Sequence, residues 1–380
     1  MEEGIDLMAG HEEVEIKLWK KKLSRRRIVK LLLTAIAALG FAGCARFLGL
    51  DEADEEEAEK EVKDKESEIN DQEEKEKEGE EAKEKAKKDP DDKEAEAKSG
   101  REGMPLRKLG KTGALVSILG LGGAFTLAAG DRAKEAEKII HRALERGINY
   151  IDTAPSYGSS EKNIGQAIKD RREDLFLASK TLDRTYEGTM KLLHQSLQRL
   201  QADYLDLLQV HGLHSADELE QVMDEGGALE ALTELKSEGL VRFTGISGHR
   251  DPQVLLEAIK RYDFDCILLS LNPADPYYQP LQEEVLPLAK EKDMGIIAMK
   301  VTAYGRLFRN DGLDSMEKAL SYALSFPVSS AVVGISTLEE LEENIGIVKD
   351  FQPLDAGELQ KLEKLVEPYQ SEVNFFKKEW

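Results

Sequence analysis

AEKIIHRALERGINYIDTAPSYG, residues 136–158, contains in order a helix, a stop, a strand and a loop. Apolar residues recur with the spacing of one helix face at Ala136, Ile139, Ile140, Ala143 and Leu144. Gly147 is of the residue type that commonly ends a helix, and the apolar run after it, residues 148–152, suits a strand buried on both faces. This stretch therefore predicts a helix packed against a buried strand.

The same alternation recurs on both sides of this stretch. Short apolar and β-branched runs occur at residues 116–120, 148–152, 175–180, 204–211, 241–247, 265–271, 295–300 and 330–336. Amphipathic segments separate them, and eight such pairs over about 250 residues are typical of a closed parallel barrel. We predict an α/β fold, a (β/α)8 TIM barrel in residues 104–380. A doubly wound open sheet is the alternative, but GLGG at residues 120–123 lacks the G-x-G-x-x-G spacing of its nucleotide-binding turn.

The segment before the barrel, residues 45–103, differs in composition from the rest of the chain. Residues 51–100 hold 24 Asp and Glu against 11 Lys, and so carry −13 of the formal net charge of −22. Residues 51–100 contain hardly an aliphatic residue beyond Val62 and Ile69 and cannot form a core, so we expect residues 45–103 to be a disordered acidic linker. It is either a charged spacer or a solvated connection without a specific role. The rest of the chain still carries −22 + 13 = −9, and phosphate binding needs clustered cations, so nucleic acid is an unlikely partner.

Residues 1–44 combine a basic patch with a charge-free apolar run. The run at residues 31–43 is too short for an ordinary transmembrane helix but suits the apolar part of a signal peptide. SRRRIVK at residues 24–30 resembles a twin-arginine export signal, and FAGC at residues 41–44 resembles a bacterial lipobox. The resemblance implies export of the folded protein, lipidation of Cys44 and a membrane anchor outside the cytoplasm. An amphipathic or buried helix is one alternative. Another is that the arginine signal is unused and the protein stays cytoplasmic.

Residues with chemical capacity end three consecutive strand-like runs. Asp152 ends the second run, Lys180 the third and His211 the fourth, while Tyr157 lies in the loop after Asp152. The carboxyl ends of barrel strands form one rim, where the active sites of such barrels lie. Each residue has an ordinary structural explanation when taken singly, but four suitable types on one rim indicate a catalytic site.

This set of residues suits hydride transfer to a carbonyl group. The carbonyl oxygen develops negative charge, and the Tyr157 phenol can donate a proton to it. A free tyrosine has a pKa of about 10, and we expect the ammonium of Lys180 to lower it. Asp152 can hold Lys180 in place and charged, and His211 can orient the carbonyl oxygen by a hydrogen bond.

The chain from residue 104 to about residue 349 resembles the aldo-keto reductases. The resemblance is carried by LGKTGALVSILGLGG, GINYIDTAPSYGSSEKNIGQAI, ASK, SLQRLQADYLDLLQVHG and VVGISTLEELEENI. It implies a nicotinamide-dependent oxidoreductase that reduces an aldehyde or ketone, or oxidises the matching alcohol. It also implies that Asp152, Tyr157, Lys180 and His211 are the catalytic tetrad.

The same resemblance implies a set of cofactor contacts. They fall on Ser247, Met299, Gly334, Ser336, Glu343 and Asn344. The family commonly has Asn and Gln at the positions of Gly248 and Leu268, and a Tyr that stacks under the nicotinamide at the position of Met299. A thioether can still pack on an aromatic face. Where many relatives bind the 2′-phosphate of NADP with Arg or Lys, this chain has Glu339 and Glu340, so we expect either NADP or NAD.

Other residues lead to smaller predictions. Cys266 lies in an apolar run, and we expect it to be a buried small residue. His249 is either a substrate contact or part of a loop that starts a helix, and DPYY at residues 275–278 is a candidate pocket lining. No cluster of Cys, His and carboxylates has metal-ligand spacing, so we predict no metal.

Two functions from different classes follow. The first is an enzyme for a small carbonyl or alcohol substrate, with Tyr157 as the general acid or base. The second is a barrel that binds the dinucleotide but acts as a sensor or as a partner of a membrane complex, which the altered amide-binding positions favour. Because free dinucleotides are scarce outside the cytoplasm, export implies a cofactor that is bound before translocation and then kept. The substrate and the oligomeric state cannot be determined from the residues.

Overall fold

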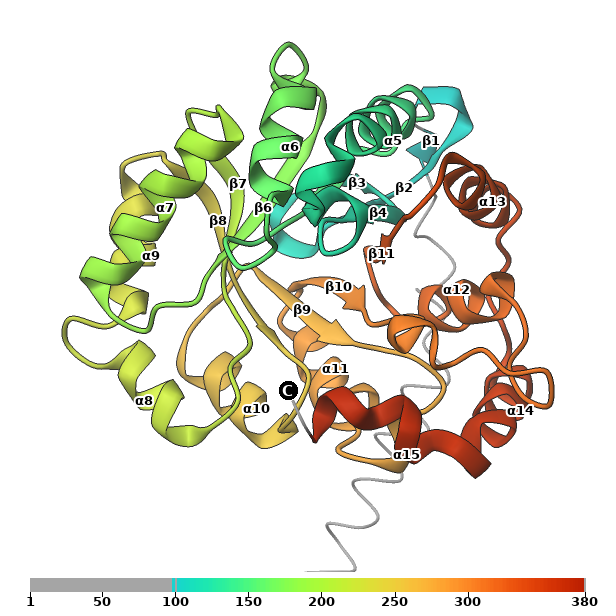
Figure 1. The fold of residues 1–380 in the computed structure, drawn as a ribbon. Coiled ribbons are helices and arrows are strands. Elements are labelled where there is room, and N and C mark those ends of the chain that lie inside the picture. The colour runs from blue at the N-terminus through green and yellow to red at the C-terminus, as the bar shows by residue number, and fades with distance from the viewer. Residues whose placement is uncertain (1–97, 100, 379–380) are drawn as a thin grey trace, which may run out of the picture. The chain divides into compact units, whose positions relative to one another are not determined.

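The computed structural model describes residues 98–99 and 101–378, in which eight parallel strands close into a barrel (Figure 1). The strands are β4 (Leu119–Gly122), β5 (Tyr150–Asp152), β6 (Phe176–Thr181), β7 (Leu205–Val210), β8 (Val241–Gly248), β9 (Cys266–Ser270), β10 (Gly295–Met299) and β11 (Ser330–Gly334), and β11 pairs with β4 to close the ring. The predicted parallel barrel is confirmed, and the open sheet was the wrong alternative. The predicted signal segment and the linker up to residue 97 lie outside the described residues.

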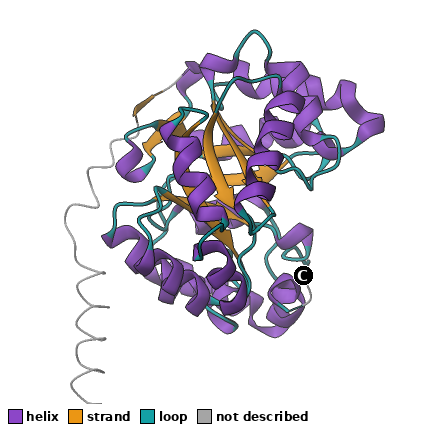
Figure 2. Cartoon of the chain, turned by 90° about the vertical axis from the view of Figure 1, so that its left-hand side faces the viewer, coloured by secondary structure: helices purple, strands orange, loops and turns teal. Residues whose placement is uncertain are grey.

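Helices follow the strands and form a layer outside them (Figure 2). They are α5 (Ala133–Glu145), α6 (Ser160–Ile168), α7 (Tyr186–Leu200), α8 (Ala216–Met223), α9 (Ala228–Ser237), α10 (Pro252–Arg261), α11 (Leu281–Glu291), α12 (Met316–Leu324) and α13 (Leu338–Lys349). The chain continues through α14 (Ala356–Val366), the single turn α15 (Gln370–Val373) and a 3₁₀ helix, Asn374–Lys377. Within residues 98–99 and 101–378, no helix combines the length and the apolar character needed to cross a bilayer.

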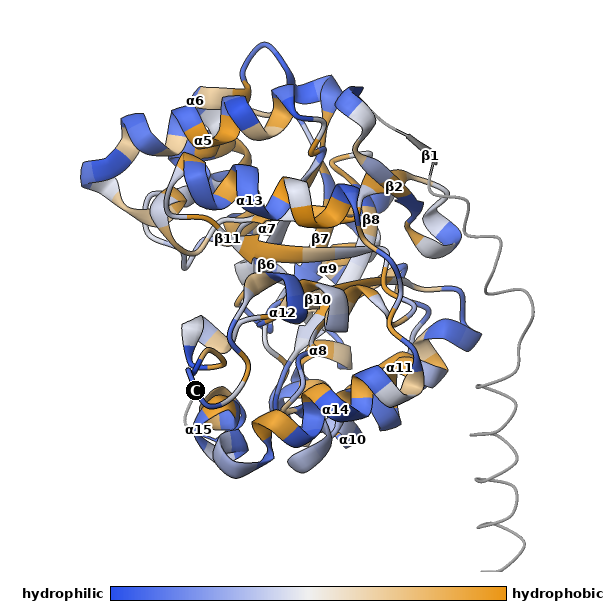
Figure 3. Cartoon of the chain, turned by 90° about the vertical axis from the view of Figure 1, so that its right-hand side faces the viewer, coloured by the Kyte–Doolittle hydropathy of each residue, from blue (hydrophilic) through white to orange (hydrophobic). Residues whose placement is uncertain are grey.

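Helix α5 shows why these segments fold against the barrel. Its predicted apolar face, from Ala136 to Leu144, is buried in the core, and polar residues occupy its other face (Figure 3). Gly147 follows with a φ of +92°. A β-carbon at Gly147 would lie 2.2 Å from the Arg101 carbonyl oxygen, so this turn requires glycine both for its conformation and for its space. The turn delivers the chain directly into β5.

A β-hairpin covers the barrel at the end where the strands begin. Its strands are β2 (Pro105–Lys108) and β3 (Leu115–Ser117), and β1 (Lys98–Ser99) pairs with β2. Leu109 in the hairpin is fully buried in one cluster with Cys266 and Ile297 of the barrel interior. The predicted first barrel strand, residues 116–120, is therefore wrong in its bounds. It joins the end of β3 to the start of β4, because only Ile118 separates the hairpin strand from the barrel strand.

Candidate active site

Asp152, Tyr157, Lys180 and His211 lie together at the carboxyl ends of neighbouring strands. Asp152 ends β5, Lys180 lies near the end of β6, and His211 directly follows β7. The Lys180 ammonium lies 4.9 Å from the centroid of the Tyr157 ring. The rings of Tyr157 and His211 meet edge to face, with their centroids 5.8 Å apart. The fold thus brings the four residues together, while their catalytic roles stay predictions.

A buried ion pair forms the base of this group. The side chains of Lys180 and Asp152 are 1% and 5% exposed, and the ammonium donates to Asp152 Oδ1. It also donates to the Thr153 carbonyl oxygen (2.8 Å), and Gln209 Nε2 donates to Asp152 Oδ2 (3.1 Å). Burial lowers the pKa of Lys180, but Asp152 and Tyr157 together outweigh burial and raise this pKa above its ordinary value. Lys180 is therefore held in place and charged.

The pKa of Tyr157 differs from the sequence-based prediction. Burial raises it above the ordinary tyrosine value, and the charge of Lys180 lowers it only in part, because Asp152 opposes Lys180. The predicted effect of Lys180 is present, but the enclosure of the phenol at the barrel mouth outweighs it. Tyr157 is thus a phenol that keeps its proton at neutral pH, as a proton donor must.

His211 is half-buried beside Tyr157 and is neutral. Burial lowers its pKa to about 2, and the charges of Lys180 and Arg184 act in the same direction. Its Nδ1 atom has no hydrogen-bond partner within the described residues. A neutral imidazole keeps one N–H group that can donate to a carbonyl oxygen placed next to Tyr157.

A first cavity of about 430 Å³ opens between β10 and the start of α13. Its lining includes five of the six predicted cofactor residues, namely Met299, Gly334, Ser336, Glu343 and Asn344, together with Asp152, Tyr157 and Leu268. A β-carbon on Gly334 would lie 1.9 Å from the Phe125 ring, and one on Gly122 would lie 3.1 Å from the backbone of Val333. Gly334 thus leaves room for the Phe125 ring, which also lines the cavity, and Gly122 allows close contact between the neighbouring strands β4 and β11.

The far end of the first cavity lies at the start of α13 and is acidic. The Glu340 carboxylate accepts a hydrogen bond from the Ser336 amide (2.7 Å), and Thr337 Oγ1 accepts one from the Glu340 amide (3.2 Å). Glu343 also lines this end of the cavity. A helix start attracts anions, but the two carboxylates here reduce that attraction.

A second cavity of about 610 Å³ lies beside the first, and its lining includes Lys180, His211, His249 and the remaining predicted cofactor residue, Ser247. The residues that line both cavities are Ala124, Tyr157, Met299, Lys300 and Tyr304, which we call the shared wall. The Ser247 hydroxyl accepts from the Gly212 amide (2.9 Å) and donates to the Val210 carbonyl oxygen (3.2 Å). Ser247 therefore fixes the loop that carries His211, and it does not line the first cavity.

Sequence reasoning missed Lys300 and Tyr304. The Lys300 ammonium donates to the Tyr304 hydroxyl (2.6 Å) on the shared wall. Lys300 ends the run at residues 295–300 just as Lys180 ends the run at residues 175–180, so the rule that selected Lys180 could have found it.

The smaller predictions have mixed outcomes. Cys266 is fully buried, as predicted, and burial raises the pKa of its thiol. His249 lines the second cavity, which agrees with its role as a candidate substrate contact. The DPYY segment at residues 275–278 lines neither cavity, so that prediction is wrong; its Asp275 instead forms a buried ion pair with Lys377. In the part of the chain that the structure describes, no group of three or more His, Cys, Asp or Glu could hold a metal ion.

Comparison with known proteins agrees with this geometry. The model of the aldo/keto reductase family matches residues 118–318. An uncharacterized oxidoreductase of Bacillus subtilis, YqkF, is 31% identical over 64% of this chain and 90% of its own length. The L-galactose dehydrogenase of Arabidopsis thaliana is 30% identical over 69% of this chain and 94% of its own length. Among solved structures, the holo form of the aldo-keto reductase AKR11C1 from Bacillus halodurans has a TM-score of 0.58 and 30% identity, covering 69% of this chain and 96% of its own.

Proposed function

Because this chain belongs to the aldo/keto reductase family and is an oxidoreductase of that family, we propose that it reduces an aldehyde or ketone, or oxidises the matching alcohol, with NAD or NADP in the first cavity. The observation that carries the proposal is the position of Tyr157 on the wall between two cavities, beside the Lys180–Asp152 pair. One relative is named L-galactose dehydrogenase, after the oxidation of a sugar. Its name supports the proposal that an alcohol can be the substrate, with the reaction running in the oxidising direction.

Each of the four residues has a part in the proposed reaction. Tyr157 donates its proton to the carbonyl oxygen as that oxygen becomes negative, and takes it back when an alcohol is oxidised. The buried ammonium of Lys180 stabilises the phenolate that remains, and Asp152 keeps this ammonium in place. His211, being neutral, orients the carbonyl oxygen by a hydrogen bond.

The residues of the first cavity fit a dinucleotide. The Phe125 ring, for which Gly334 leaves room, lines this cavity and offers a flat apolar surface on which an aromatic group can pack. Met299, Ser336 and Asn344 line this cavity; in this proposal Met299 packs on the nicotinamide ring, and Ser336 and Asn344 hold the adenosine part. When bound, the dinucleotide supplies or accepts the hydride. The carboxylate of Glu340 repels the additional 2′-phosphate of NADP. We therefore propose NAD as well as NADP as the cofactor.

The experiment uses the purified full-length protein, a panel of aldehydes and ketones, and both dinucleotides. Tyr157→Phe removes the proton donor and keeps the ring, so we expect turnover to fall by roughly 10²–10⁴-fold while dinucleotide binding is unchanged. Tyr186→Phe is the matched control, because the Tyr186 hydroxyl binds Glu234 between the outer helices α7 and α9 (2.8 Å). Turnover that survives Tyr157→Phe would contradict the assigned role, and a failure of both dinucleotides to bind would end the cofactor proposal.

A sensor or partner subunit is the second candidate function. Gly248 and Leu268 replace the amide-binding residues common in the family, and Leu268 lines the first cavity with an apolar side chain. Tight dinucleotide binding without turnover of any carbonyl compound in the panel would favour this function over the enzyme.

We also propose that the protein is exported by the twin-arginine route and anchored to a membrane through Cys44. The support is the sequence of residues 24–44 alone, which lies outside the described residues. Incorporation of a labelled lipid precursor at Cys44, absent in Cys44→Ser, is the expected result. A protein that stays unlabelled and cytoplasmic would overturn this proposal and leave the proposed reaction untouched.

A further inference from the structure

The loop that carries His211 is held by hydrogen bonds to its backbone. It comprises residues 211–214, which we call the His211 loop, and each of its four backbone amides donates a hydrogen bond. In chain order the acceptors are the Thr181 carbonyl oxygen (2.9 Å), the Ser247 hydroxyl (2.9 Å), the Ser247 carbonyl oxygen (3.0 Å) and Glu218 Oε2 (2.9 Å). Three neighbouring segments of the fold thus fix the course of the loop.

Arg184 binds the same loop through its carbonyl oxygens. Arg184 Nη2 donates to the carbonyl oxygen of His211 (2.9 Å) and to that of Gly212 (3.0 Å). The same nitrogen lies 3.3 Å from Glu218 Oε2, the atom that accepts from the His214 amide. The ion pair of Arg184 and Glu218 therefore binds the His211 loop at both of its ends.

Arg184 is itself anchored to the helices outside the barrel. It lies between β6 and α7, and its carbonyl oxygen accepts from the Ala228 amide at the start of α9 (2.8 Å). Figure 1 shows α7, α8 and α9 together on one side of the barrel. The Arg184 side chain is only 14% exposed. A guanidinium held in this way can keep a loop in one position.

The position of the His211 ring depends on this loop. The ring meets the Tyr157 ring edge to face, with the centroids 5.8 Å apart, and both residues line the second cavity. Within the described residues, His211 Nδ1 has no hydrogen-bond partner. The ring is thus placed by its packing and by the backbone that carries it, and not by a hydrogen bond at Nδ1.

We propose that Arg184 is a positioning residue, which acts through the His211 loop to hold the His211 ring where it binds the carbonyl oxygen of the substrate. This inference rests on the proposed function, because that function gives His211 its contact with the substrate. A displacement of about 1 Å in a group that orients a reacting atom can lower the rate by about 10²-fold. The alternative is that Arg184 binds the substrate directly, because it also lines the second cavity.

The test is a double-variant cycle with the purified full-length protein, saturating dinucleotide and an aldehyde that the protein reduces. Arg184→Met removes both carbonyl contacts, and we expect kcat to fall by at least about tenfold. In the His211→Gln background, Arg184→Met should lower kcat by less than about twofold, because the ring that Arg184 positions is gone. Arg184→Lys should keep most of kcat, since its ammonium has N–H donors and the same charge.

Arg107→Met is the matched control. Arg107 Nη1 also donates to two backbone carbonyl oxygens, those of Leu324 (3.1 Å) and Val328 (2.7 Å). It lies in the hairpin strand β2, at the opposite end of the barrel. This variant loses contacts of the same kind, so it should lose stability in chemical denaturation but keep its kcat.

A variant at Glu218 tests the same contacts if Arg184→Met does not fold. The Glu218 side chain is 33% exposed, so its removal by Glu218→Ala disturbs the core less. This variant takes away the ion pair of Arg184 and the acceptor of the His214 amide. We expect kcat to fall by about threefold or more, and this loss should disappear in the His211→Gln background.

Three kinetic results would overturn the inference. One is an unchanged kcat in Arg184→Met while the wild-type protein reduces the aldehyde; the inference then fails and the proposed function stands. The second is a loss of kcat that is equally large with and without His211, which would make the role of Arg184 independent of the ring. The third is a higher KM for the aldehyde with kcat unchanged, which would assign Arg184 to direct substrate binding.

A nuclear magnetic resonance measurement keeps the inference testable without turnover. The nuclear Overhauser effect between the ring protons of His211 and Tyr157 should weaken in Arg184→Met and return in Arg184→Lys. The effect between His249 and Phe376, whose rings also meet edge to face, should stay unchanged. If the first effect weakens but no aldehyde is reduced, the positioning of the ring by Arg184 stands and the proposed reaction fails. Equal effects in Arg184→Met and the wild-type protein overturn the inference.

Discussion

Lys180 and Asp152 depend on each other, because both are almost completely removed from solvent. Breaking a buried ion pair leaves one charge without a partner, which typically costs about 3–5 kcal/mol. We therefore expect Lys180→Met to lower the free energy of unfolding by that amount, measured by chemical denaturation, and to reduce turnover as well. The loss of stability arises because Asp152 stays buried without a cation. The loss of turnover arises because Tyr157, the proposed proton donor, no longer has an ammonium beside it.

A double variant separates these two effects. In Lys180→Met with Asp152→Leu, no unpaired charge remains, so stability should recover by a large part of the loss seen in Lys180→Met. Turnover should stay low, because Tyr157, the proposed proton donor, still lacks the ammonium of Lys180. If the stability loss of the double variant equals the sum of the losses of Lys180→Met and Asp152→Leu, the two residues do not interact energetically, which would contradict the prediction.

Single residues also show where prediction from the sequence succeeded and where it could not. Lys180 was found because a strand end places a side chain at the barrel mouth, and strand ends follow from local hydrophobic patterns. The direction of the Tyr157 pKa was missed, because its burial depends on distant loops that the sequence does not place. The left-handed backbone of Lys300, with a φ of +56°, was equally hidden, because Asn272, whose side chain binds the Lys300 carbonyl oxygen, lies 28 residues earlier in the chain.

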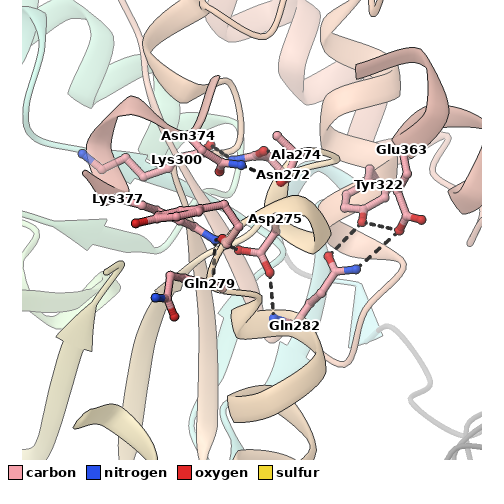
Figure 4. A network of polar contacts seen from close by, with 11 residues as sticks. Asn272, Ala274, Asp275, Gln279, Gln282, Lys300, Tyr322, Glu363, Asn374 and Lys377 are labelled. Carbon is pink, nitrogen blue, oxygen red and sulfur yellow. Dashed lines mark hydrogen bonds and ion pairs between the residues drawn. The ribbon is translucent and has the colours of Figure 1, made fainter. Parts of the chain in front are cut away.

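The C-terminal segment, Asn374–Lys377, is an element whose placement depends on one buried pair. Lys377 and Asp275 are 0% and 1% exposed and lie 2.5 Å apart, and Lys377 also donates to the carbonyl oxygens of Tyr278 and Gln279 (2.8 Å each) (Figure 4). The segment carries Phe376, which packs between His249 and Lys300. It thereby supports one side of the second cavity.

We expect Lys377→Met to release this segment, because Asp275 would stay buried without its cation at a cost of about 3–5 kcal/mol. The expected results are faster limited proteolysis near the C-terminus and a higher KM for the carbonyl substrate. Dinucleotide affinity should change less than the KM, because no residue of Asn374–Lys377 lines the first cavity. Lys378→Met is the control, because Lys378 is exposed and donates to Ser371 (2.9 Å). Equal proteolysis of the two variants would contradict the prediction.

Elements differ in how far the sequence determines them. The strands from β5 to β11 were placed to within a few residues, because each is a short apolar run bounded by turn residues. The bounds of the first barrel strand were wrong because the hairpin strand β3 and the barrel strand β4 form one apolar run. The interpretation of Asp275 failed for another reason: its partner, Lys377, is 102 residues away in the chain.

For the whole molecule, the histidines of the second cavity link stability to pH. The pKa values of His211 and His249, about 2 and about 3, lie far below the ordinary value of 6.5. Below pH 6.5 the unfolded chain takes up protons that the folded chain refuses, so stability is lost as the pH falls from about 6.5 toward 3. At pH 5 each imidazole should account for roughly 2 kcal/mol of lost stability.

Chemical denaturation at pH 7 and pH 5 checks this prediction, with His249→Gln as the comparison. Between pH 7 and pH 5 the variant should lose less stability than the wild-type protein. The difference in the free energy of unfolding should equal the contribution of one imidazole, roughly 2 kcal/mol. An identical pH dependence of the two proteins would mean that His249 titrates in the folded state much as it does in the unfolded chain.

The shared wall has a consequence for the kinetics. Because Tyr157, Met299 and Lys300 face both cavities, a bulky carbonyl compound that enters first would intrude on the space of the nicotinamide. For the proposed reaction we therefore expect a compulsory order, with the dinucleotide entering first and leaving last. Excess carbonyl compound should then form a dead-end complex with the empty protein, so that the rate declines at high substrate concentration and recovers when more dinucleotide is added.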